Sequence, residues 1–165
     1  LVPALGTTHA GLAMALVTAT AIAGRTLTGW VLPTGTDWRL VAAVSYAIQI
    51  TGSIAFLAAA GANIPLLYLG IVLFGLGFGN GTWLPPLIAT VEFVPVEVAR
   101  VVALIVAIAQ GSYAFAPAAF GLIRDWSAHE IGTELGEAPI VFVSAAFIQG
   151  LAVIAFLAGR RKANC

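Results

Sequence analysis

The feature that most constrains the fold of this chain is the length of its stretches without Asp, Glu, Lys or Arg. Four such stretches occur, at residues 1–24, 40–91, 101–123 and 138–159. A helix needs about 20 apolar residues to cross the hydrocarbon core of a bilayer. The longest stretch holds two such segments, divided at GANIP (61–65), and each of the others holds one. The sequence therefore predicts five membrane-spanning segments.

The composition agrees with a membrane location. Charged residues make up 8% of the chain and hydrophobic residues 61%, whereas roughly a quarter of the residues in a soluble domain are charged. The apolar stretches are far longer than the strands of a membrane barrel and lack their alternating pattern, so helices are predicted. We therefore expect an all-α integral membrane protein in a lipid bilayer. The five helices are predicted near residues 8–32, 38–60, 64–92, 96–124 and 138–160.

The basic residues lie mostly on one side of the predicted membrane. Only Arg124 lies on the other side, and six basic residues share the first: Arg25, Arg39, Arg100, Arg160, Arg161 and Lys162. Because cytoplasmic segments collect Lys and Arg, we expect a cytoplasmic carboxyl terminus, with the amino terminus, the 61–65 turn and the 125–137 loop outside. The inner (plasma) membrane of a bacterium is the expected location.

Arg25 has two possible placements, because it lies inside the first predicted helix. Its guanidinium can reach the membrane surface from the last turns of the helix, or the span can begin near residue 3 and end before Arg25. The sequence leaves both arrangements open.

No enzyme signature is present in the sequence. It contains no zinc-binding His-Glu-x-x-His helix, no Gly-x-Ser-x-Gly elbow, no phosphate-binding glycine loop and no pair of carboxylates at membrane depth. The single cysteine, Cys165, is terminal and has no metal-site spacing around it. The net charge is zero, so binding to nucleic acid is not indicated. We expect no catalysis, cofactor or metal.

Each predicted span has an amide or hydroxyl side chain near its centre: Thr18 and Thr20, Gln49, Asn80, Gln110 and Gln149. Hydrogen bonds between membrane helices are typically worth about 1 kcal/mol or less. This packing role is expected for Gln49 and Gln149. For Asn80 and Gln110, packing and contact with a substrate are equally open, because their neighbours are also unusual.

The stretch FGLGFGNGTWLPP (74–86) has glycine at every second position from 75 to 81. At about 100° per residue, Gly75 and Gly79 share one helix face, and Gly77 and Gly81 share nearly the opposite one. Other helices are therefore expected to approach closely on two sides, as small residues allow in membranes. The proline pair that follows interrupts the hydrogen bonding of the next turn. A static kink and a gating bend both fit this pattern.

Two connections carry a family resemblance. AGRTLTGW (23–30) followed by DWR (37–39) resembles the cytoplasmic connection between the eighth and ninth helices of the major facilitator superfamily. VEFVPVEVAR (91–100) resembles that family's Glu-x-x-Pro…Arg signature between the tenth and eleventh helices. The resemblance covers essentially the whole chain. It implies that residues 1–165 are a carboxyl-terminal membrane domain, with LVPAL as the end of the seventh helix and the five spans as the eighth to twelfth.

The resemblance implies a function for the chain. It indicates part of a secondary transporter that works by rocking of two six-helix halves about a midplane site. The missing amino-terminal half is then a partner of this chain, and the tenth and eleventh helices line the central cavity. No charge lies between residues 40 and 91 or between 101 and 123. An ionisable residue for a proton or an anionic substrate is therefore expected in the missing half.

The resemblance also implies a charge cluster of Arg25, Glu92 and Arg100 that closes the cytoplasmic face in one state of the transporter. All three residues are expected at the cytoplasmic ends of their helices. Three independent charges are the alternative, since exposed ion pairs are worth only about 0–1 kcal/mol.

The candidate substrate-binding residues are Asn80, Trp83, Gln110 and Tyr113. Both pairs have i, i+3 spacing, so each presents two side chains on one helix face, and Asn80 and Gln110 are both expected near mid-bilayer. The amides can bind a small polar substrate, and the rings can wall its cavity. The alternative is that Asn80 and Gln110 bond to each other and the rings fill packing gaps.

Two other functional classes stay open. A non-transporting membrane subunit or scaffold would use the same glycine faces for partner helices. A five-span channel would need an oligomer to enclose its pore.

Overall fold

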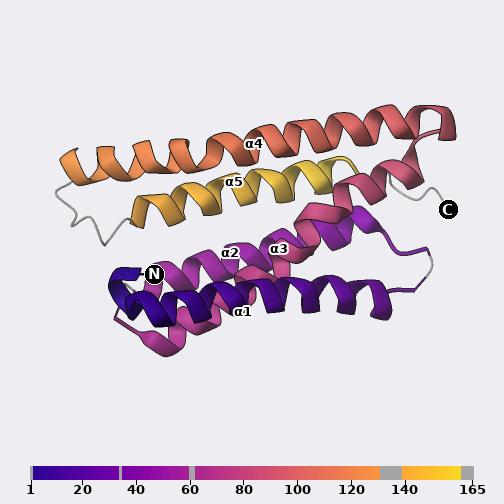
Figure 1. Ribbon diagram of the computed structural model, residues 1–165. Coiled ribbons are helices and arrows are strands. Elements are labelled where there is room, and N and C mark those ends of the chain that lie inside the picture. Colours follow the sequence, from indigo (N-terminus) through magenta and orange to yellow (C-terminus); the bar gives the residue numbers. More distant parts are fainter. Residues whose placement is uncertain (1, 34, 60–61, 131–138, 161–165) are drawn as a thin grey trace.

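The computed structural model describes residues 2–33, 35–59, 62–130 and 139–160, and these residues form five helices and no strand (Figure 1). The helices are α1 (Val2–Val31), α2 (Trp38–Ala59), α3 (Ile64–Glu92), α4 (Pro95–Glu130) and α5 (Pro139–Ala158). Each is long and apolar enough to cross a membrane. The protein is therefore an all-α membrane protein, as predicted.

The helix ends differ from the predicted ones in α1 and α4. α1 begins at Val2 instead of residue 8, which is possible because a proline in the first helical turn, here Pro3, removes no internal hydrogen bond. α4 continues to Glu130, so the prediction that residues 125–130 belong to a connecting loop is wrong. No proline or glycine interrupts the chain there. The rest of the predicted loop lies outside the described residues.

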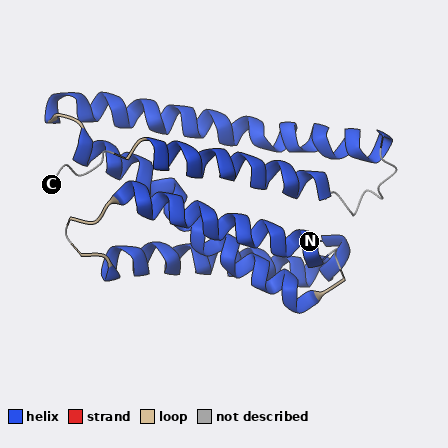
Figure 2. Ribbon diagram, turned by 180° about the vertical axis from the view of Figure 1, so that it is seen from behind, coloured by secondary structure: helices blue, strands red, loops and turns tan. Residues whose placement is uncertain are grey.

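α3 is the central helix of the bundle. It packs against α1 and α2, while α5 packs against α2. Among the described elements, α4 contacts α3 and α5 but neither α1 nor α2. Figure 2, seen from behind, shows α4 running along α5 on the side away from α1. The bundle therefore has a tight three-helix group, α1 to α3, and a more open side formed by α4.

The glycines of α3 explain this tight group. A Cβ atom on Gly75 or Gly79 would collide with backbone carbonyls of α1, at Val17 and Ala21 respectively. A Cβ atom on Gly77 would collide with the Ser45 carbonyl of α2. Close approach on two opposite faces is therefore confirmed.

One end of the bundle, here called the charged end, is formed by the 32–37 connection, the α3–α4 turn and the last residues of α5. The connection turns through Gly35, whose φ of 91° strongly favours glycine. Asp37 then caps α2, because its Oδ1 accepts hydrogen bonds from the backbone N–H groups of Arg39 and Leu40, both at 3.1 Å. At the opposite end Asn63 caps α3 in the same way, through Leu66 N.

Candidate functional site

Asn80 is buried between α3 and α1, with 7% of its surface exposed. Its Nδ2 donates to Thr28 Oγ1 of α1 at 2.9 Å, and its Oδ1 accepts from Trp83 Nε1 at 3.2 Å. Thr28 in turn donates to the Gly24 carbonyl at 2.8 Å. Both ends of the amide are therefore used, and the Trp83 ring is held in one orientation.

Trp83 lies between groups from two other helices. The guanidinium carbon of Arg25, on α1, lies 5.8 Å from the centre of the Trp83 ring, within the range of a cation–π contact. Trp38, at the start of α2, meets the same ring edge-on, with 6.0 Å between ring centres. The Asn80–Trp83 pair thus joins α1, α2 and α3 in the half of the bundle nearest the charged end.

Gln110 and Tyr113 are placed elsewhere. Both are exposed on α4, Tyr113 by 49%, and within the described part of the chain neither bonds to Asn80 or Trp83. The predicted four-residue patch is therefore brought together only in its α3 half. The alternative, a direct bond between Asn80 and Gln110, is also not seen among these residues.

A largely apolar groove of about 540 Å³ runs between α1 and α2, near the charged end. Asn80 and Ser45 are among its polar wall residues, and Thr36 and Asp37 line it from the 32–37 connection. Much of the remaining wall is aliphatic: Leu27, Val31, Leu32, Leu40, Val41, Val44 and Ile48. Such a surface suits an apolar group better than a charged one.

A second polar network joins α2 to α5. Gln149 Nε2 donates to Gln49 Oε1 at 3.3 Å, and Ser53 Oγ donates to Gln149 Oε1 at 3.2 Å. All three side chains are buried. The predicted packing role of Gln49 and Gln149 is confirmed.

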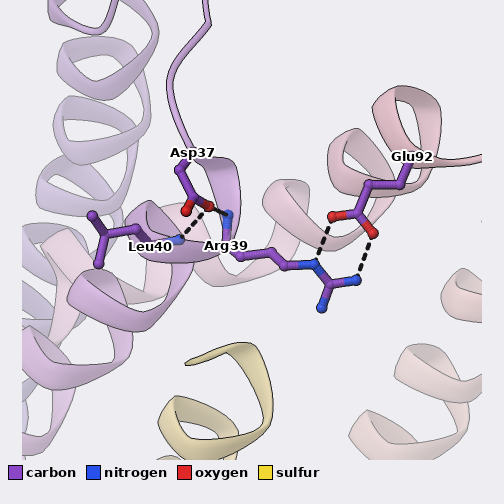
Figure 3. A network of polar contacts seen from close by, with 4 residues as sticks. All are labelled: Asp37, Arg39, Leu40 and Glu92. Atoms are coloured by element: carbon purple, nitrogen blue, oxygen red, sulfur yellow. Dashed lines mark hydrogen bonds and ion pairs between the residues drawn. The ribbon is translucent and has the colours of Figure 1, made fainter. Parts of the chain in front are cut away.

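At the charged end, Arg39 and Glu92 form a two-point ion pair between α2 and α3 (Figure 3). Arg39 Nε donates to Glu92 Oε1 at 2.6 Å and an Nη donates to Oε2 at 2.5 Å. Each side chain is 26% exposed, so water screens this pair less than a surface pair. Glu92 is the last residue of α3, and the pair therefore fixes the end of the central helix.

The predicted cluster of Arg25, Glu92 and Arg100 has a different arrangement. Glu92 pairs with Arg39, and Arg25 lies over Trp83. Arg100 is exposed, with no ion pair or side-chain hydrogen bond in the described ranges. In the sequence, Arg39 stood out only as one of the basic residues on the cytoplasmic side and as part of the DWR motif. It was predicted at the same end of the bundle as Glu92, which allows the pairing, but Arg25 and Arg100 were predicted at that end as well.

Asp37 adds a second ion pair at this end, with Arg160 just after α5. Arg160 Nε donates to Asp37 Oδ2 at 2.7 Å. Partial burial by itself raises the pKa of Asp37, but the hydrogen bond from Arg160 and those from the Leu40 and Arg39 backbones outweigh it, so the pKa lies below its usual value. Through its two oxygens, Asp37 therefore caps α2 and ties α5 to it.

This shift predicts a small loss of stability in acid. Because the pKa is lowered in the folded state, the contribution of the pair is complete above the usual value of 3.8 and is lost as pH falls through the lowered pKa. Asp37→Asn keeps the cap and removes the charge. We expect the variant to unfold at a slightly lower temperature than the unmodified protein at pH 7, and the difference to be smaller near pH 3. An equal difference at both pH values would contradict this assignment.

Comparison with known proteins identifies no similar protein. No protein-family model matches the chain, and no curated protein or solved structure matches it. Within the described residues, no group of three or more His, Cys, Asp or Glu side chains is placed to hold a metal ion. The candidate site thus consists of the Asn80–Trp83–Thr28 network with Arg25 beside it, and of the ion pairs at the charged end.

Proposed function

We propose that this chain is the carboxyl-terminal part of a secondary active transporter of the major facilitator type, which moves a small solute by alternating access. The observation that carries the proposal is the construction of α3. Glycine faces lock this helix between α1 and α2, Pro85 and Pro86 interrupt it, and an ion pair holds its last residue. A helix built in this way can bend near one end while the rest stays packed.

The exposure of α4 supports a missing partner surface. No residue from 95 to 126 is buried, although this helix carries Gln110, Ser112 and Tyr113 in its spanning part. Polar side chains in membrane spans usually face protein or a water-filled cavity, because lipid offers them no hydrogen bonds. In the proposal, α4 faces the central cavity and the amino-terminal half of the transporter.

The charged end is the cytoplasmic end in this proposal. The arginine asymmetry of the sequence supports that orientation. The two ion pairs then lie at the inner face, where a transporter of this type closes in its outward-open state.

Alternating access can be tested without knowing the substrate. Phe78 is the middle residue of α3, which spans Ile64–Glu92, and it is 37% exposed. In the protein made from its complete reading frame, with Cys165 replaced by serine, Phe78→Cys is expected to react with an impermeant thiol reagent from either side of a sealed vesicle. A cavity that opens alternately to the two sides gives this result.

The matched control is Ile148→Cys, near the middle of α5 and 56% exposed, which is expected to face lipid and to stay unlabelled from both sides. Ala62→Cys and Val96→Cys, at opposite ends of the bundle, report the orientation. Labelling of Phe78→Cys from neither side would favour a scaffold over a transporter. Simultaneous access from both sides, seen as ion leakage, would favour a channel.

A further inference from the structure

Arg25 is a charged side chain inside a membrane span. It lies within the span His9–Val31 and six residues before Val31, the end of α1, which is about 9 Å from that end along the helix axis. The sequence left open whether α1 ends before Arg25, and the structure places it inside the helix. A cation within a span usually has a counter-charge or a polar cavity.

No such counter-charge is seen within the described residues. Their ion pairs use Arg39, Arg124 and Arg160, whereas the Arg25 guanidinium lies over the face of the Trp83 ring. Stacking on a ring leaves the N–H groups at the rim of the guanidinium free to donate. Arg25 therefore keeps its hydrogen-bonding capacity for a group outside these residues.

The ring beneath the guanidinium is held in place. Trp83 Nε1 donates to Asn80, and Asn80 donates to Thr28 of the same helix as Arg25. This network fixes the ring relative to α1. Trp83 and Asn80 consequently position the cation, and Arg25 is the group that can touch a ligand.

Arg25 is exposed on α1. The described helices therefore do not enclose it, and a small ligand can reach its guanidinium.

We propose that Arg25 binds the carboxylate of a small organic anion, and that this anion is the transported substrate. The second part rests on the proposed transport function. A guanidinium donates two parallel hydrogen bonds to a carboxylate, which gives both charge and geometric recognition. The ionisable substrate-binding group that the sequence assigned to the missing half then lies in this chain.

The test is a binding measurement on the protein made from its complete reading frame, purified in detergent. Sodium acetate, oxalate and benzoate are titrated at constant ionic strength while the unfolding temperature is followed. At least one carboxylate is expected to raise it in a saturable way. Arg25→Gln is expected to lower the affinity for that carboxylate by about tenfold or more, as loss of a charged hydrogen-bonding partner does.

Two further variants keep the test decisive. Arg25→Lys retains the positive charge but lacks the planar guanidinium that donates two parallel hydrogen bonds. It is therefore expected to fold and to bind with intermediate affinity. Arg100→Gln removes an exposed arginine from α4 and is expected to leave the affinity unchanged. If Arg25→Gln folds poorly, the difference between Arg25→Lys and Arg100→Gln carries the comparison.

The proposal is overturned if none of the three carboxylates stabilises the unmodified protein, or if Arg25→Gln binds with unchanged affinity. Stabilisation by phosphatidylglycerol alone would also overturn it, because the ligand would then be a lipid phosphate. The outcome is separable from that of the proposed function. Carboxylate binding without two-sided labelling of Phe78→Cys would leave the anion site standing and remove the transport role.

Discussion

Replacing Gly79 with leucine is expected to prevent normal assembly of the bundle. A Cβ atom at this position would collide with the Ala21 carbonyl, and a backbone group cannot move aside as a flexible side chain can. Overpacking typically costs about 1–3 kcal/mol, and we expect a loss at the upper end of this range. The measurement is the yield of monodisperse protein in detergent together with its unfolding temperature.

Gly150→Leu, on α5, is the matched control for this experiment. It introduces the same side chain into another apolar helix, where a Cβ atom meets nothing within 4 Å, and it removes a helix-weakening glycine. Its yield and unfolding temperature are therefore expected to be unchanged or slightly higher. Equal loss in both variants would mean that the leucine at residue 79 is not excluded by close packing of α1 against α3.

Removing the carboxylate of Glu92 is expected to shift the protein toward the state that is open at the charged end. Glu92→Gln leaves the half-buried Arg39 without its two-point partner. We expect the loss to be about 1 kcal/mol, the upper part of the range for partly exposed pairs. That corresponds to a roughly fivefold change in the ratio of two states. In the Phe78→Cys background, labelling from the charged-end side should increase and labelling from the other side should decrease.

Arg39→Gln is expected to produce a shift in the same direction, and the double variant is expected to shift less than the sum of the two single variants, because both substitutions remove the Arg39–Glu92 pair. Glu97→Gln is the control: it removes an exposed carboxylate from the first turn of α4 and should leave labelling unchanged. Unchanged labelling in Glu92→Gln would show that the Arg39–Glu92 pair does not hold this end closed.

Features that belong to a single helix could be predicted from the sequence. The charge-free stretches fixed the number and approximate bounds of the spans. The alternating glycines also identified two opposite contact faces of α3, because the angle between residues is set by the helix itself. α1 and α2 occupy those faces.

Features that depend on how one helix is placed against another could not be predicted in the same way. The i, i+3 spacing put Gln110 and Tyr113 on one face of α4 but said nothing about the tilt of α4, which lies beside α5. The same limit applied to the charges. Each arginine was assigned to an end of a helix, but the choice of Arg39 over Arg25 or Arg100 as the partner of Glu92 depends on the three-dimensional arrangement.

The charge balance of the ion pairs determines how the protein responds to a membrane voltage. Asp37, Arg39, Glu92 and Arg160 form two pairs of opposite charges, so the group has no net charge. Moving one elementary charge across a potential of 100 mV changes its free energy by about 2.3 kcal/mol. When the members of a neutral group move together, these changes cancel. Rearrangement of this end is therefore expected to be nearly independent of voltage. Arg25 lies within a span as a single charge, and voltage dependence of any movement of α1 would report on that residue.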